Sequence, residues 1–137
     1  MESPLAQGSA LKIERRFNES APAQISESLV PIPATVLDTS VTTLITAADG
    51  EFLRIDHVAV HCPTGTPNVR IFLVPDGGSA SQATNAIIDT GMTADETKHL
   101  QSVEGYVLGP GMAMAALSTV NDAVVIFASI TRITQGK

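Results

Sequence analysis

Apolar and polar residues alternate along most of the chain beyond residue 34. Every second residue is apolar over residues 69–73, and again over residues 124–130. A period of two is typical of β-strands that turn one face to a core and the other to solvent. No long segment carries the three-and-four spacing of an amphipathic helix, so the pattern predicts an all-β domain.

Turn-forming residues interrupt this pattern about every 8 to 12 residues, which is the spacing expected of a sandwich or barrel. The interruptions contain Gly, Pro, Asp or Asn, and they fall at residues 48–50, 63–68, 75–78, 109–111 and 121–122. Between them we expect about eight strands, at residues 35–37, 41–46, 51–62, 69–74, 85–90, 99–103, 112–118 and 123–133.

The longest of these strands, residues 51–62, changes its inward face partway along. Leu53 and Ile55 lie on one face, whereas Val58 and Val60 lie on the opposite one. A β-bulge, or a strand that passes from one sheet to the other, would produce this change. About eight strands, one of which changes its inward face, favour an antiparallel jelly-roll sandwich over an immunoglobulin-type sandwich. The sequence leaves the exact topology open.

The first part of the chain has a different composition. Residues 1–33 contain prolines at positions 4, 22, 31 and 33 and have few apolar residues. Each proline removes a backbone donor and favours an extended conformation in the residue before it. We therefore divide the chain into an extended N-terminal arm, residues 1–33, and a jelly-roll domain, residues 34–137.

The arm is expected to order on a partner, because its apolar residues are too sparse to form a core. Leu11 and Phe17 are candidate apolar anchors, and Arg15 and Arg16 are candidate partners for acidic groups on another surface.

The charge content changes the picture of possible partners. Charged residues make up 16% of the 137 residues, against about 25% in typical proteins. The 8 basic residues are scattered and the net charge is −6, so nucleic acid is a poor candidate partner. A neutral surface of this kind suits a protein that rests against other protein.

The chain also lacks the marks of export or of a membrane span. Its start has no apolar core of signal-peptide length, and no stretch approaches the roughly 18 apolar residues of a membrane helix. Cys62 is the only cysteine, so packing rather than disulfides must stabilise the fold. We expect a soluble protein that is made in a cytoplasm and has no membrane partner.

Few residues are candidates for chemistry, and none has the spacing of a known site. His57 and His61 share a strand face without a carboxylate or thiolate beside them, and His99 is distant in sequence. Residues 77–81 lack the Gly-x-Ser-x-Gly elbow and the Lys-Ser/Thr ending of a phosphate loop. The acidic residues show no identifiable catalytic pair. We therefore expect no enzyme activity, no metal ion and no cofactor.

One strand is apolar on both faces. Residues 112–117 read Met-Ala-Met-Ala-Ala-Leu, which indicates either burial between layers or an outward face that another subunit covers. We favour the second explanation. Met112 and Met114 are then candidate contacts in a homo-oligomer, with a dimer preferred and a trimer next.

Three segments together resemble a known family. They read FLRIDHVAVHCPTG at residues 52–65, NVRIFLVPDGGSASQATNAI at 68–87 and LQSVEGYVLGPGMAMAALSTVNDAVVIFASITRI at 100–133. This order is similar to that of small β-sandwich virion proteins of tailed bacteriophages, in which a strand ending in Val-Pro-x-Gly-Gly precedes an Asn-Ala and a Leu-x-Pro-Gly turn. The resemblance covers about residues 50 to 133, and the turn reads Leu-Gly-Pro-Gly at residues 108–111.

The resemblance implies a structural role. Because the chain has no second module or coiled-coil shaft, it is most like a capsid cement or decoration protein, which would bind the outside of the capsid and hold neighbouring major capsid proteins together. The implied location is the capsid surface of the virion, after synthesis in the bacterial host cytoplasm. The alternative is a receptor- or carbohydrate-binding module of a phage tail or head fibre, which the lack of Trp disfavours.

Overall fold

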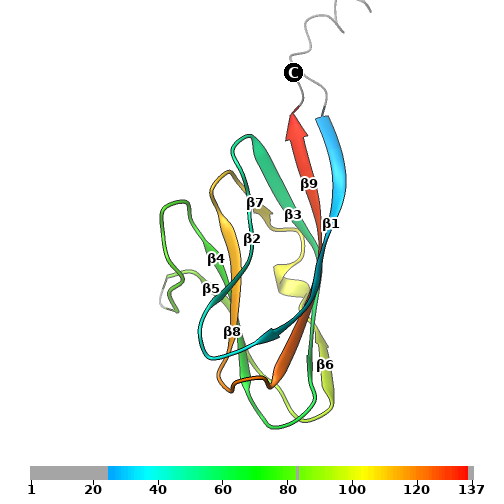
Figure 1. Ribbon diagram of the computed structural model, residues 1–137, viewed down its shortest axis with the longest axis vertical. Helices are drawn as coiled ribbons and strands as arrows, with labels where there is room; N and C mark the ends of the chain where they lie inside the picture. Colours follow the sequence, from blue (N-terminus) through cyan, green and yellow to red (C-terminus); the bar gives the residue numbers. More distant parts are fainter. Residues whose placement is uncertain (1–24, 83, 136–137) are drawn as a thin grey trace, which may run out of the picture.

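The computed structural model describes residues 25–82 and 84–135, and these residues form two antiparallel sheets packed face to face (Figure 1). The first sheet has the order β1 (Ile25–Leu37), β9 (Val124–Gln135), β3 (Glu51–Cys62) and β6 (Glu96–His99), with β7 (Val107–Leu108) also paired to β3. The second has the order β2 (Thr42–Thr46), β8 (Ala113–Ser118), β4 (Asn68–Val74) and β5 (Ala86–Gly91). The predicted all-β sandwich is confirmed.

The strand pairs are nested within one another. β4 pairs with β5 and β3 with β6, while β2 pairs with β8 and β1 with β9. The chain is thus one long antiparallel ribbon wound into two sheets, which is the jelly-roll topology.

The change of inward face in β3 is a β-bulge. The register against β9 shifts between Ile55 and His57, so Asp56 is the extra residue. Because of this insertion, Leu53 and Ile55 before the bulge and Val58 after it are all fully buried in the core. The bulge was one of the two explanations that the sequence allowed.

Strand β1 begins earlier than the sequence predicts. It starts at Ile25, and residues 25–32, which were assigned to the arm, pair with β9. Pro31 and Pro33 suggested an unpaired segment, but β1 is an edge strand with one neighbour, and an edge position tolerates a missing donor. The register shift between Ile32 and Thr35 lies at these prolines.

The segment expected as a strand at residues 99–103 also differs. β6 ends at His99, and a 3₁₀ turn, η1 (Gln101–Val103), follows it. Leu100 and Val103 are both buried. A helical turn, unlike a strand, places residues three apart on the same side, which explains why this apolar spacing is not a strand.

The two apolar faces of β8 are both covered within the chain. Met114 is fully buried between the sheets, whereas Ala113 and Ala115 belong to a second cluster with Phe72 and Val74. This second cluster is covered by partly buried residues, Ala80, Ala86 and Leu117. Burial within the chain therefore accounts for the two apolar faces of this strand. We had favoured the other explanation, a cover provided by another subunit.

A three-residue polar network holds the bulge on the outer side of the first sheet. Arg54 Nε lies 2.8 Å from Asp56 Oδ1, and Thr131 donates its hydroxyl to Asp56 while it accepts a bond from Arg54 at 3.2 Å. Burial works to raise the pKa of Asp56, but the hydrogen bonds from Thr131 and Arg54 outweigh it and hold that pKa below the ordinary range. The network favours the ionised carboxylate.

This network predicts an acid-dependent loss of stability. Because the pKa of Asp56 is lowered by folding, its contribution is present above the ordinary aspartate pKa of about 3.9 and is lost as the pH falls through the folded value. Thr131→Val should lower the free energy of unfolding at pH 7 by about 1 to 3 kcal/mol, since a bond to a charged group is removed.

Urea unfolding from pH 7 down to about pH 2 measures this effect. The difference in free energy of unfolding between the variant and the parent protein should become smaller below about pH 4. Thr43→Val, at an exposed position in β2, is the matched control and should change stability by less than about 0.5 kcal/mol. A difference that stays constant down to the lowest pH would exclude a role for the Asp56 carboxylate.

Two turns that carry the family resemblance contact each other. Gly111 has a positive φ of 83°, and a Cβ added to it would lie 2.8 Å from the Cβ of Asp76. Its N–H donates to the Ala47 carbonyl at 2.8 Å, and the Ala47 N–H donates to Met112 at 2.9 Å. A glycine is needed at residue 111 both for its backbone conformation and for the close approach of residue 76.

We expect Gly111→Ala to destabilise the protein by about 2 to 4 kcal/mol, the sum of strain at positive φ and a clash with Asp76. Gly105→Ala is the control, because Gly105 also has a positive φ, of 90°, but nothing lies within 4 Å of an added Cβ. It should cost about 1 to 2 kcal/mol from strain alone. Equal losses in thermal unfolding would show that the contact with Asp76 is unimportant.

The position of β1 leads to a prediction about deletions. Removal of residues 1–20 leaves all of β1 and should not change the fold, whereas removal of residues 1–33 takes away most of the strand that pairs with β9. The longer deletion should lower the melting temperature or prevent folding, because β9 becomes an unprotected edge. Circular dichroism and thermal unfolding of the two variants test this. Identical melting of both would place residues 25–33 outside the folded unit.

Candidate functional site

Large apolar side chains are exposed on the outer side of the first sheet. Ile126 and Ile130 of β9 are fully buried, so the residues that alternate with them point away from the core. In this register the outward-facing residues include Ile25, Leu29, Val36, Phe52 and Phe127, and we call these five residues the apolar face.

The apolar face lacks a cover among the described residues. Its five members are between 42% and 78% exposed. Three charged residues lie among them. Arg54 and Asp56 form an ion pair at 2.8 Å, and the exposed Glu27, opposite Ile133, adds one negative charge. The surface is therefore apolar with little net charge, which is typical of a protein–protein contact.

A groove of about 510 Å³ lies over the second sheet. Ala113 and Ala115 line it from β8, and Val41, Thr43 and Ala80 are among the other lining residues. Small and neutral side chains predominate, and none of the described residues that line it is aromatic. Sugar-binding platforms usually present exposed aromatic side chains, and the lining of this groove has none among the described residues.

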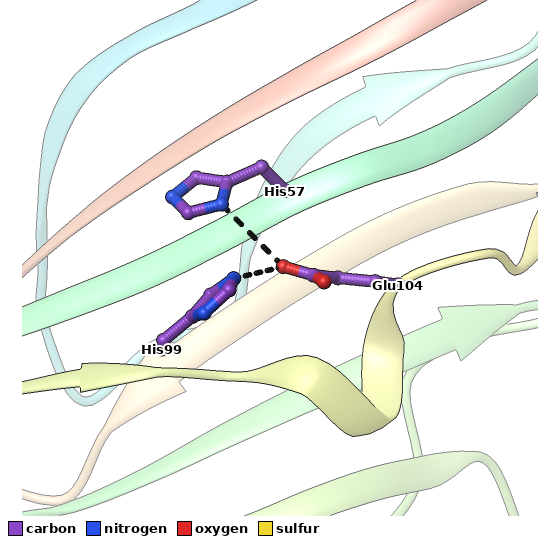
Figure 2. A group of neighbouring side chains, drawn as sticks. All are labelled: His57, His99 and Glu104. Atoms are coloured by element: carbon purple, nitrogen blue, oxygen red, sulfur yellow. Dashed lines mark hydrogen bonds and ion pairs between the residues drawn. The ribbon is translucent and has the colours of Figure 1, made fainter.

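A polar cluster lies at the β6 side of the first sheet. His57 of β3, His99 at the end of β6 and Glu104 just after η1 turn their side chains toward one another (Figure 2). His57 Nδ1 is 3.5 Å from Glu104 Oε2, and His99 Nε2 contacts the same oxygen. The two imidazole rings have centroids 4.3 Å apart. We call these three residues the His-His-Glu cluster.

This cluster corrects the sequence-based view of the histidines. His61 lies on the same face of β3 as His57, as expected, but it is not part of the cluster and bonds Thr97 through Nδ1 at 2.8 Å. His99 and Glu104 bring two further candidate ligand atoms within 4.8 Å of His57, which the sequence analysis did not anticipate. No spacing in the sequence signals this meeting, because it depends on which strand lies beside β3 and on the turn at η1.

The remaining candidates from the sequence fall in different places. Met114 is fully buried and presents no surface to a partner, whereas Met112 is half-buried beside the Gly109–Gly111 turn. The four arm residues, Leu11, Arg15, Arg16 and Phe17, lie outside the described residues. Their proposed contacts stay predictions.

Asp89 and Cys62 are engaged in structural bonds. Asp89 accepts a hydrogen bond from Asn68 at 3.0 Å and pairs with Arg70 at 3.3 Å; the bond from Asn68, followed by Arg70, lowers its pKa. The Cys62 thiol is buried and bonds the Thr64 carbonyl. A carboxylate with a lowered pKa is a poor general acid, and a buried thiol is a poor nucleophile.

Among the described residues no helix is long and apolar enough to cross a membrane.

Comparison with known proteins gives likenesses in fold rather than in sequence. No family model matches the chain, and no curated protein has significant sequence similarity to it. A structure from Bacillus endospore appendages, which are disulfide-linked pili, matches 83% of this chain and 91% of its own with a TM-score of 0.53 and 13% identity. At this identity the likeness shows a shared fold.

Two structures of infectious bursal disease virus match more weakly. The Gx strain structure has a TM-score of 0.47 and 14% identity over 83% of this chain, and the Gt strain structure has 0.41 and 10% over 85%. This chain spans 33% and 34% of those viral chains.

Proposed function

We propose that this protein is a structural protein of a bacteriophage virion, which binds the outside of the capsid and cements neighbouring major capsid proteins together. The observation that carries the proposal is the exposed apolar face. No catalytic site is identifiable among the described residues, whereas five exposed apolar side chains on one side of a sheet suit a contact with protein. The sequence resemblance over residues 50 to 133 is the reason for proposing a bacteriophage capsid as the assembly.

The apolar face is the proposed contact between two copies of the chain. A two-fold dimer brings the same patch of each copy together, so the patch must be compatible with itself. The apolar face is largely compatible with itself, because its members are apolar and the Arg54–Asp56 pair among them is internally compensated. Like-charge repulsion between two such faces is then confined to the Glu27 carboxylates.

The contact with the capsid is assigned to the N-terminal arm. Its sequence combines apolar anchors, Leu11 and Phe17, with the charges of Arg15 and Arg16, a mixture suited to a groove with acidic margins. A rigid dimer presents two arms, and two weak contacts on one lattice bind much more tightly than one. The similarity in fold to a structure from endospore pili is compatible with a structural role in an assembly.

The alternative role, a receptor- or carbohydrate-binding module of a tail or head fibre, has less support. Its natural site would be the groove over the second sheet, which has no aromatic lining among the described residues. Binding to glycans in place of capsids would favour this alternative.

Charge placed on the apolar face tests the proposed dimer. Leu29→Asp and Phe127→Asp should each raise the dimer dissociation constant at least about tenfold, since burying one such side chain contributes about 1.5 to 3 kcal/mol. Sedimentation velocity measures this. Val120→Asp is the control, because Val120 is similarly exposed, at 48%, but lies in the turn between β8 and β9.

The same proteins test cementing by co-sedimentation with capsids that lack their decoration protein. Variants of the apolar face should bind more weakly through loss of the second arm. Deletion of residues 1–20 should weaken capsid binding substantially and leave dimerisation unchanged. Full capsid binding by the deleted protein would overturn the role of the arm, and failure of the intact protein to bind any capsid would overturn cementing.

A further inference from the structure

We propose that His57, His99 and Glu104 form a binding site for a divalent transition-metal ion of the zinc type. The inference concerns a site separate from the proposed capsid contact and does not depend on it. It replaces the sequence-based expectation that no metal is bound, which assumed that His57 has no further ligands near it.

The donor atoms have the spacing of a metal site. One ligand atom from each of the three residues lies within 4.8 Å of the other two. Ligands that are about 2.1 Å from a tetrahedral zinc ion lie about 3.4 Å from each other, and His57 Nδ1 is 3.5 Å from Glu104 Oε2. Small rotations of side chains that are 51%, 44% and 23% exposed bring the three atoms around one ion.

The backbone holds the three ligands in place. After β6 the chain leaves β3 for the η1 turn and then returns, and both ends of this excursion are bonded to β3: Leu100 N–H to Val58 at 2.8 Å and Gly105 N–H to Ile55 at 2.8 Å. Val103, at the end of the turn, is fully buried and fixes the excursion to the core. The site is thus built on anchored backbone, which favours metal binding by reducing the ordering cost.

The type of donor selects the type of ion. Two imidazole nitrogens and one carboxylate oxygen suit Zn²⁺, Ni²⁺ or Cu²⁺, whereas Mg²⁺ and Ca²⁺ prefer oxygen donors alone. Three protein ligands leave at least one coordination position of a tetrahedral ion open. Because His57 and His99 are exposed, that position faces solvent and accepts water.

A zinc titration of protein without a His tag, by isothermal calorimetry, tests the site. We expect one ion per chain, and a rise in melting temperature when zinc is present, because a ligand that binds the folded state stabilises it. His57→Ala, His99→Ala and Glu104→Gln should each weaken binding at least tenfold. Their circular dichroism spectra should match that of the parent protein, since the three side chains lie on the surface.

His61→Ala is the matched control. His61 lies four residues from His57 on the same strand but bonds Thr97 and is not a member of the cluster. It should retain the zinc affinity of the parent protein. Binding that is lost in His61→Ala, or that is unchanged in His57→Ala, would mean adventitious binding to surface histidines and would overturn the site.

A second measurement uses the unaltered protein, so that it does not depend on the folding of variants. In an NMR titration with zinc, the imidazole signals of His57 and His99 should shift or broaden at one equivalent while those of His61 remain in place. The absence of any shift at a millimolar zinc concentration would also overturn the proposal.

Discussion

The extra residue in β3 is the constraint on which much of this structure depends. A strand without a bulge alternates strictly, so it could bury either Ile55 or Val58 but not both. The bulge at Asp56 reverses the alternation and lets both ends of β3 face one core. The cost is an outward-facing acidic group in the middle of the sheet, and the bonds from Arg54 and Thr131 compensate it.

The bulge lies opposite an interruption of the neighbouring edge. Opposite it, the strand that would continue β6 is interrupted by η1, and the regular ladder resumes only at β7. Glu104 therefore lies on an excursion of the backbone, beside His57, the first residue after the bulge. The polar network and the His-His-Glu cluster therefore both lie next to the bulge on the first sheet.

The features that the sequence predicts are those that depend on local alternation and on turn residues. The reversal of phase between Ile55 and Val58 is visible in the order of apolar residues, and so are the glycine turns that include Gly111. Features that depend on neighbours in space are not visible. The meeting of His57 with His99 follows from the β3–β6 pairing, and Pro31 is tolerated because β1 has a single neighbour. The spacing of residues along the chain predicts neither feature.

The two sheets differ in how far the apolar side chains on their outer sides are covered. On the second sheet the small side chains Ala113 and Ala115 allow residues of the β4–β5 connection, such as Ala80, to pack over them, so that surplus apolar surface is covered within the chain. On the first sheet Leu29 and Phe127 have no such cover among the described residues. Among the described residues, uncovered apolar surface is therefore concentrated on the first sheet, whereas the sequence pattern of β8 placed it on the second.

The apolar face and the His-His-Glu cluster are neighbours on that sheet. In the β3–β9 register His57 lies opposite Ser129, and Ala59, two residues further along the same face, lies opposite Phe127. A partner seated on Phe127 would therefore approach His57 and exclude water from it. Excluding water strengthens electrostatic interactions, and a metal ion with an open coordination position could accept a ligand from that partner. Metal binding and assembly would then be coupled through one strand pair, although each rests on separate residues.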